Sequence, residues 1–252
     1  MTGASTGFDR LLALGDDALV MAQRLGGWCA RAPEMEEDVA LANIALDQLG
    51  AARLLLGYAG EVEGAGRDED ALAFLRTDRE YRNALLAELP DGDFAVLVAK
   101  LLFFCSFQRL RYARLAGGPD ERLAAIAAKA VKESAYHVDH GAQWTVRLGD
   151  GTDESHRRMQ SGLDDVWPYA YELFERDALL DRLVERGVAA DPALLEPQWR
   201  ATVETVLAEA TLTVPETTWR PTGGRRGRHL TGFGYLLAEL QHLHRSHPEA
   251  TW

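Results

Sequence analysis

The segment Lys132–His137 holds the residues of this chain that come nearest to a metal-ligand motif. A Glu-x-x-His pair on a helix places a carboxylate and an imidazole on one face, and two such pairs can hold two iron ions. Here the residue three positions before His137 is Ser134. A hydroxyl cannot supply the anionic bridging oxygen that an iron pair requires. The segment therefore indicates half of an iron site that lacks one ligand.

Three pairs at helical spacing could also suit a metal: Glu133 with His137, His137 with His140, and Glu239 with His242. The first is more typical of an ion pair or hydrogen bond along a helix. The last lies near the C-terminus, where a surface position is the expectation. Two interpretations stay open: a metalloenzyme that uses His137 with carboxylates elsewhere, or a protein that has lost such a site.

A glycine- and arginine-rich segment is the second informative feature. It gathers Arg225, Arg226, Arg228 and His229 in a chain whose net charge is −12. Guanidinium groups bind carboxylates and phosphates in a forked geometry, and the start of the helix that follows favours an anion. The segment predicts contact with an anionic surface or a phosphate. The alternative is a solvated loop that neutralises neighbouring acids.

Composition excludes several classes of function. The acidic balance argues against a nucleic-acid or membrane-surface binder. Cys29 and Cys105 lie far apart and form no Cys-x-x-Cys pattern, which argues against redox or zinc chemistry. The N-terminus lacks the pattern of a signal peptide, and no run of 18 apolar residues is present. We expect a cytoplasmic protein that neither spans nor binds a membrane.

Apolar periodicity predicts helices along the whole chain and no strand. Four long helices are predicted over 9–30, 33–58, 94–116 and 120–147. A further helix is predicted over 152–175, shorter ones over 177–186, 192–209 and 230–246, and a polar helix or pair of turns over 68–88. The short turn Gly117–Pro119 predicts antiparallel packing of the helices beside it. The expected architecture is one all-α domain, residues 1–252, built on four long helices with shorter additions.

Segments from one end of the chain to the other resemble the PaaC subunit family of the bacterial phenylacetyl-CoA epoxidase. They are Trp28–Glu34, Asp38–Ile44, Leu46–Gly50, Lys129–Glu133, Tyr136–His137, Arg147–Thr152, Glu209–Leu212 and Thr222–Gly227. The resemblance implies a ferritin-like four-helix bundle with additional shorter helices. It also implies a non-catalytic subunit that pairs with a catalytic PaaA-type subunit and with other epoxidase subunits, or forms a homo-oligomer when alone.

The same resemblance implies where the chemistry of the complex lies. The catalytic subunit would hold the di-iron centre and bind the CoA ester, and a separate reductase would supply electrons from NADPH. The complex would epoxidise the ring of phenylacetyl-CoA with O2. The arginine-rich segment would then lie at the subunit interface or near the CoA phosphates.

Aligned by motif, four positions of this chain correspond to the two Glu-x-x-His pairs of the catalytic subunit. They are Gln48, Ala51, Ser134 and His137, with Ala18 at the first lone carboxylate position. Only His137 keeps ligand chemistry, so we expect no catalytic residue and no metal in this chain. The alternatives are an independent di-iron oxygenase that uses His137 and carboxylates outside these motifs, and a stand-alone binding protein.

Overall fold

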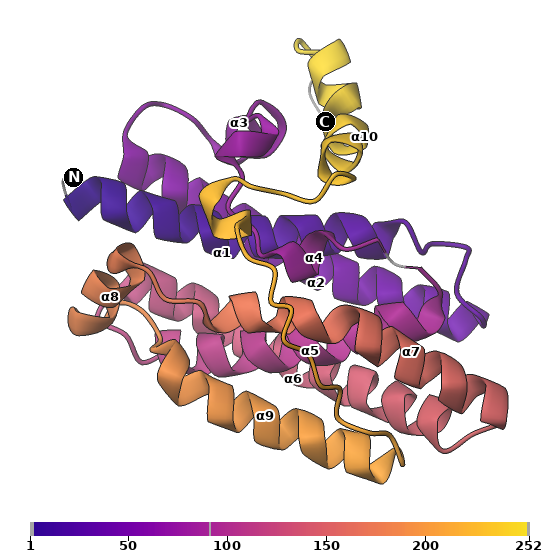
Figure 1. Ribbon diagram of the computed structural model, residues 1–252. Coiled ribbons are helices and arrows are strands. Elements are labelled where there is room, and N and C mark those ends of the chain that lie inside the picture. The colour runs from indigo at the N-terminus through magenta and orange to yellow at the C-terminus, as the bar shows by residue number, and fades with distance from the viewer. Residues whose placement is uncertain (1–2, 91, 251–252) are drawn as a thin grey trace. The chain divides into compact units, whose positions relative to one another are not determined.

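The computed structural model describes residues 3–90 and 92–250 (Figure 1). Over these residues it contains ten α-helices, three short 3-10 helices and no strand. The chain divides into two compact units, one of residues 3–90 with 222–250 and one of residues 92–221. That the chain is a single domain stays a prediction, and each unit is described by itself.

The first unit is built on a long antiparallel pair, α1 (Gly3–Gly26) and α2 (Met35–Glu63). Gly15 of α1 allows the two helices to pack closely: a Cβ atom at this position would lie only 2.7 Å from Cδ2 of Leu56 on α2. Acidic residues in the first turn of α2 complement the helix dipole. Gly64, with a φ of 70°, ends the helix in the left-handed conformation.

Short elements complete this unit. They are α3 (Glu69–Phe74), the 3-10 helix η1 (Asp78–Glu80), α4 (Leu85–Glu88), the 3-10 helix η3 (Gly224–Arg226) and α10 (Phe233–Ser246). The buried amide of Gln241 on α10 donates to the carbonyl oxygens of Ala73 at 3.1 Å and Arg76 at 2.9 Å. The C-terminal segment is therefore attached to the polar stretch that follows α2.

The second unit is also built on a long antiparallel pair, α5 (Phe94–Leu115) and α6 (Glu121–Gly149). A Cβ atom on Gly141 of α6 would lie 3.1 Å from the backbone nitrogen of Leu102 on α5, so the helices meet almost backbone to backbone. The further elements are α7 (Asp153–Ala170), η2 (Tyr171–Phe174), α8 (Ala178–Glu185) and α9 (Pro192–Glu209).

An aromatic cluster fixes α9 against α5 and α7. Phe103 meets Trp167 and Trp199 edge-on, with ring centroids 5.3 and 5.5 Å apart. The indole nitrogen of Trp199 donates to the carbonyl oxygen of Phe103 at 2.9 Å, which satisfies a buried donor. Cys105 also lies on α5, and its burial raises the pKa of the thiol to about 12. A thiol with such a pKa stays protonated and unreactive at neutral pH.

The all-α prediction is confirmed, and the described elements are consistent with a ferritin-like helical fold. The predicted helix over 9–30 stops earlier, because Gly26 and Gly27 lead into a series of turns. The stretch 68–88 forms short helices and turns, as expected. Among the described helices, Met35–Glu63 alone has the length and mean hydropathy of a membrane span, but a bundle helix can share both properties.

Candidate functional site

The four positions that the resemblance aligns with iron ligands are all buried. Gln48 and Ala51 lie on the inward face of α2 in the first unit, and Ser134 and His137 lie on the buried face of α6 in the second. The hydroxyl of Ser134 donates to the carbonyl oxygen of Ala130 on its own helix at 2.7 Å. Ser134 thus serves its helix as an ordinary core hydroxyl.

These residues do not fit a di-iron centre. Where the resemblance expects acidic and imidazole ligands, Gln48, Ala51 and Ser134 offer an amide, a methyl group and a hydroxyl. Ala18 places a buried methyl group on α1. No group of three or more His, Cys, Asp or Glu side chains that could hold a metal ion occurs in the described part of the chain.

The other candidate metal pairs are also placed by the structure. Glu133 forms an ion pair with Lys129 one turn earlier on α6. Glu239 and His242 are both exposed on α10. Neither arrangement is that of a converging ligand set.

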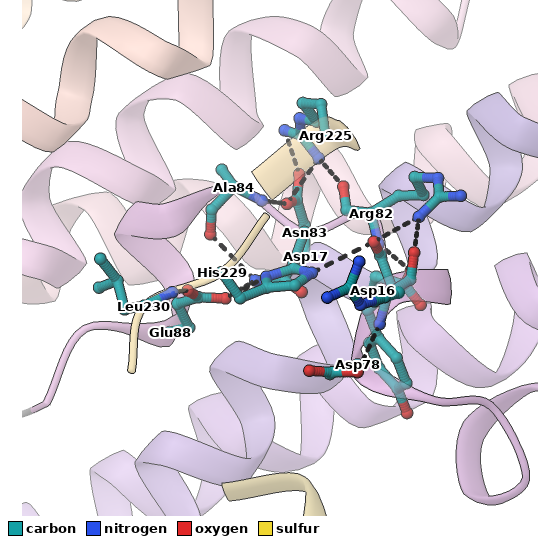
Figure 2. Close-up of polar contacts among 12 residues, drawn as sticks. Asp16, Asp17, Asp78, Arg82, Asn83, Ala84, Glu88, Arg225, His229 and Leu230 are labelled. Carbon is teal, nitrogen blue, oxygen red and sulfur yellow. Dashed lines mark hydrogen bonds and ion pairs between the residues drawn. The ribbon is translucent and has the colours of Figure 1, made fainter. Parts of the chain in front are cut away.

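A buried cluster of carboxylates and guanidinium groups lies in the first unit (Figure 2). Asp16 and Asp17, adjacent on α1, are fully buried. Asp16 binds the guanidinium of Arg76, which itself is only 2% exposed, and accepts the backbone N–H of Arg82 at 2.8 Å. Burial opposes the charge of Arg76, but the Asp16 carboxylate keeps the pKa of Arg76 above its usual value.

Asp17 ties the arginine-rich loop to α1. Nη1 and Nη2 of Arg225 each donate to the Asp17 carboxylate at 2.8 Å, and the backbone N–H of Ala84 donates to it at 2.8 Å. Nη1 of Arg225 also reaches the carbonyl oxygens of Ala13 at 3.1 Å and Arg82 at 2.9 Å. A forked, multiply bonded guanidinium of this kind holds three segments in one geometry.

Glu88, on α4, fixes the next part of the same loop (Figure 2). Its carboxylate accepts the backbone N–H of Leu230 at 2.6 Å and the side-chain amide of Asn83 at 2.7 Å. It also lies 2.6 Å from Nδ1 of His229. The His229 ring stacks on Phe233, the first residue of α10, with centroids 4.1 Å apart.

Glycines allow the loop to approach the chain beneath it. A Cβ atom on Gly224 would lie 2.2 Å from the carbonyl oxygen of Asn83, and one on Gly227 would lie 2.2 Å from that of Arg79. Gly227 also has a φ of 69°, where a side chain would be strained. The loop therefore rests directly on the backbone of residues 79–83.

The structure divides the four residues singled out in this loop into two pairs. Arg225 and His229 are turned inward, onto Asp17 and Glu88. Arg226 and Arg228 are exposed. Any contact with a partner or a CoA phosphate stays a prediction, and Arg226 and Arg228 are the side chains placed where such a ligand could reach them.

Sequence reasoning missed Asp16, Asp17 and Glu88. The signal was present in α1, where two adjacent acids interrupt the apolar stretch Leu11–Ala22. A buried charge must be paired, so such a doublet predicts basic partners. The partners could not be named, because Arg76 and Arg225 lie 60 and 208 residues further along the chain.

Fold and residue pattern together define a member of a helical protein family of phenylacetate metabolism. The family model described as phenylacetic acid catabolic protein matches residues 3–252, so the chain belongs to that family. Among curated proteins, the chain is similar to the C subunit of the 1,2-phenylacetyl-CoA epoxidase of Escherichia coli strain K12. The two are 46% identical over 241 residues, which cover 96% of this chain and 97% of the relative.

Proposed function

We propose that this chain is the non-catalytic structural subunit of a phenylacetyl-CoA 1,2-epoxidase. In this proposal it pairs with the di-iron catalytic subunit and stabilises it during aerobic phenylacetate degradation. The similarity to an epoxidase subunit of Escherichia coli supports the assignment to this complex. The iron and the electrons from NADPH would enter through other subunits, and the complex would act in the cytoplasm.

One observation carries the non-catalytic part of the proposal: the donor set at the ligand positions. Gln48, Ala51 and Ser134 are buried where carboxylates and an imidazole would be needed, and His137 alone keeps ligand chemistry. Removing those carboxylates also removes buried charge that would need a metal or a counter-ion. Such a bundle can fold without iron, while its outer faces contact a partner.

The exposed pair Arg226 and Arg228 suggests a second role for this subunit. Both lie on a loop that is fixed from below by Arg225 and His229, so their backbone is held in place. Guanidinium groups held in this way suit a carboxylate of another subunit or a phosphate of the CoA ester. This contact would contribute to assembly or to substrate binding without any chemistry in this chain.

Co-expression with a catalytic subunit of the same family tests the pairing. We expect the two chains to co-purify and to give a native mass that contains both. If this chain elutes alone at micromolar concentration while the catalytic subunit is folded and present, the subunit proposal is wrong. The stand-alone binding protein would then be the better account.

A further inference from the structure

A buried histidine joins the arginine-rich loop to the chain beneath it (Figure 2). The side chain of His229 is only 4% exposed, and that of its neighbour Glu88 is fully buried. Nδ1 of His229 lies 2.6 Å from the Glu88 carboxylate, and Nε2 lies 3.3 Å from the backbone carbonyl oxygen of Tyr81. Both ring nitrogens therefore face an oxygen atom.

These two oxygen atoms determine how many protons the His229 ring needs. A carbonyl oxygen and an ionised carboxylate can only accept a hydrogen bond, whereas a neutral imidazole has one N–H and one bare nitrogen. A bare nitrogen that faces an oxygen atom inside the protein is left without a donor, and this costs free energy. The imidazolium form has an N–H on each nitrogen and satisfies both acceptors. The geometry is that of a histidine cation paired with a carboxylate.

The surroundings of Glu88 stabilise its ionised form. Its Oε1 accepts the backbone N–H of Leu230 at 2.6 Å, and its Oε2 accepts the side-chain amide of Asn83 at 2.7 Å. The same amide nitrogen donates to the carbonyl oxygen of Ala84 at 3.2 Å, so the NH2 group of Asn83 faces the carboxylate. With His229, three donors surround one carboxylate and favour its negative charge.

Charged groups on the neighbouring elements act on the ring in both directions. The guanidinium of Arg82 donates to the same Tyr81 carbonyl oxygen at 2.8 Å, and that of Arg24 donates to the backbone oxygen of Glu88 at 3.1 Å. Both disfavour a further positive charge, but the Glu88 carboxylate contacts the ring directly and so acts at the shortest distance. The other titratable groups there have partners of their own: Asp17 with Arg225, Asp16 with Arg76, and the Tyr81 phenol with the carbonyl oxygen of Ala73.

We infer that the His229–Glu88 pair is a proton-dependent latch that holds the arginine-rich loop and the start of α10 against α4. With the ring protonated, His229 and Leu230 are both bound to the Glu88 carboxylate. When rising pH transfers the ring proton to solvent, the pair loses its opposite charges, and one ring nitrogen faces an acceptor without a hydrogen. The loop is therefore held at lower pH and loosened as the pH rises. The latch belongs to this chain alone and does not depend on the proposed function.

Nuclear magnetic resonance of the full chain tests the latch. The ring nitrogens of His229 report its protonation, and the backbone N–H of Leu230, which donates to Glu88, reports whether the loop is held. We expect the protection of this N–H against hydrogen exchange to fall about tenfold or more as the ring loses its proton, in a titration from about pH 5 to about pH 8. Protection is measured relative to an unstructured chain at the same pH, which removes the direct effect of pH on exchange.

Two histidine variants sharpen this test. In His229→Gln no proton can be gained or lost at the latch, so the protection of Leu230 should be low and independent of pH. The matched control is His156→Gln on α7, where Nδ1 of the native ring lies 2.7 Å from the carbonyl oxygen of Gly149. This control should keep the wild-type pH dependence at Leu230.

The wild-type titration decides the outcome even if His229→Gln does not fold. The inference is wrong if Leu230 stays equally protected while the His229 ring loses its proton. It is also overturned if His229→Gln folds and keeps the wild-type pH dependence. Neither result bears on the pairing with a catalytic subunit, which co-purification tests separately.

Discussion

Individual charges decide whether the arginine-rich loop is held in place. Asp17 has no exposure to water, and its carboxylate is bound by both terminal nitrogens of Arg225 and by the N–H of Ala84. A buried carboxylate is tolerated only when it is paired and hydrogen-bonded in this way. The exposed arginines of the loop therefore depend on a pair of residues that no ligand would touch.

The Asp17→Asn variant should be markedly less stable. It keeps the size of the side chain but leaves the Arg225 guanidinium without its counter-charge, which in a buried pair costs about 3 kcal/mol. We expect the free energy of unfolding to fall by about that amount in urea titrations followed by circular dichroism.

An exposed ion pair provides the control for this variant. Glu154 pairs with Arg157 and Arg158 on the surface of α7, where water screens the interaction. Glu154→Gln should leave the urea transition essentially unchanged. Equal stability of Asp17→Asn and Glu154→Gln would mean that the buried cluster contributes nothing to the fold.

At the scale of the elements, the loop separates a structural role from a contact role. Arg225 belongs to the buried cluster, whereas Arg226 and Arg228 reach solvent only one and three residues later. Substitutions within this one loop should therefore have different consequences, and those differences reveal which role each arginine has.

The double variant Arg226→Ala with Arg228→Ala should fold normally but weaken either assembly with the catalytic subunit or binding of the aryl-CoA. Its melting temperature should match wild type, because neither side chain belongs to the buried cluster. Either its affinity for the catalytic subunit should fall, or the KM of the complex for the aryl-CoA should rise, by about threefold to tenfold for two charge-assisted contacts near the surface.

Arg225→Ala is the informative comparison, because it should lower the melting temperature itself. If the double variant leaves assembly and kinetics at wild-type values, the two exposed arginines contact neither the catalytic subunit nor the CoA ester. The loop would then have the structural role of Arg225 and His229 and no other.

Sequence patterns predicted the helices well and the tertiary contacts poorly. The boundaries of α5, α6 and α9 follow from caps, turns and apolar periodicity. Each of these signals is contained in a short stretch of sequence, so no distant contact is needed to predict the boundary. That Gln48 and Ser134 correspond to iron-ligand positions stays a prediction from the family resemblance, and the structure adds only that both are buried. The exposure of Leu46 and Leu49 on α2 was not predicted, because apolar residues on both sides of a helix give no periodic contrast between its buried and exposed faces.

On the scale of the whole molecule, the described residues form an all-α structure that is consistent with a ferritin-like helical fold. No group of three or more metal-ligating side chains occurs among them. The model of its family, the phenylacetic acid catabolic proteins, matches residues 3–252. Its relative in Escherichia coli is a subunit of an epoxidase. Exposed apolar side chains on α2, Leu46 and Leu49 among them, and the exposed pair Arg226 and Arg228 lie on its surface. In the proposed function, its contribution to the complex is assembly.

The most direct test is the metal content of each subunit in the co-expressed complex. The complex would be purified from cells grown with iron and separated into its subunits under native conditions. The iron content of each subunit would then be measured by mass spectrometry. We predict that iron accompanies the catalytic subunit and that this chain carries essentially none. About two iron ions per copy of this chain, with the spectrum of a carboxylate-bridged pair, would contradict the proposed function and favour an independent oxygenase that uses His137.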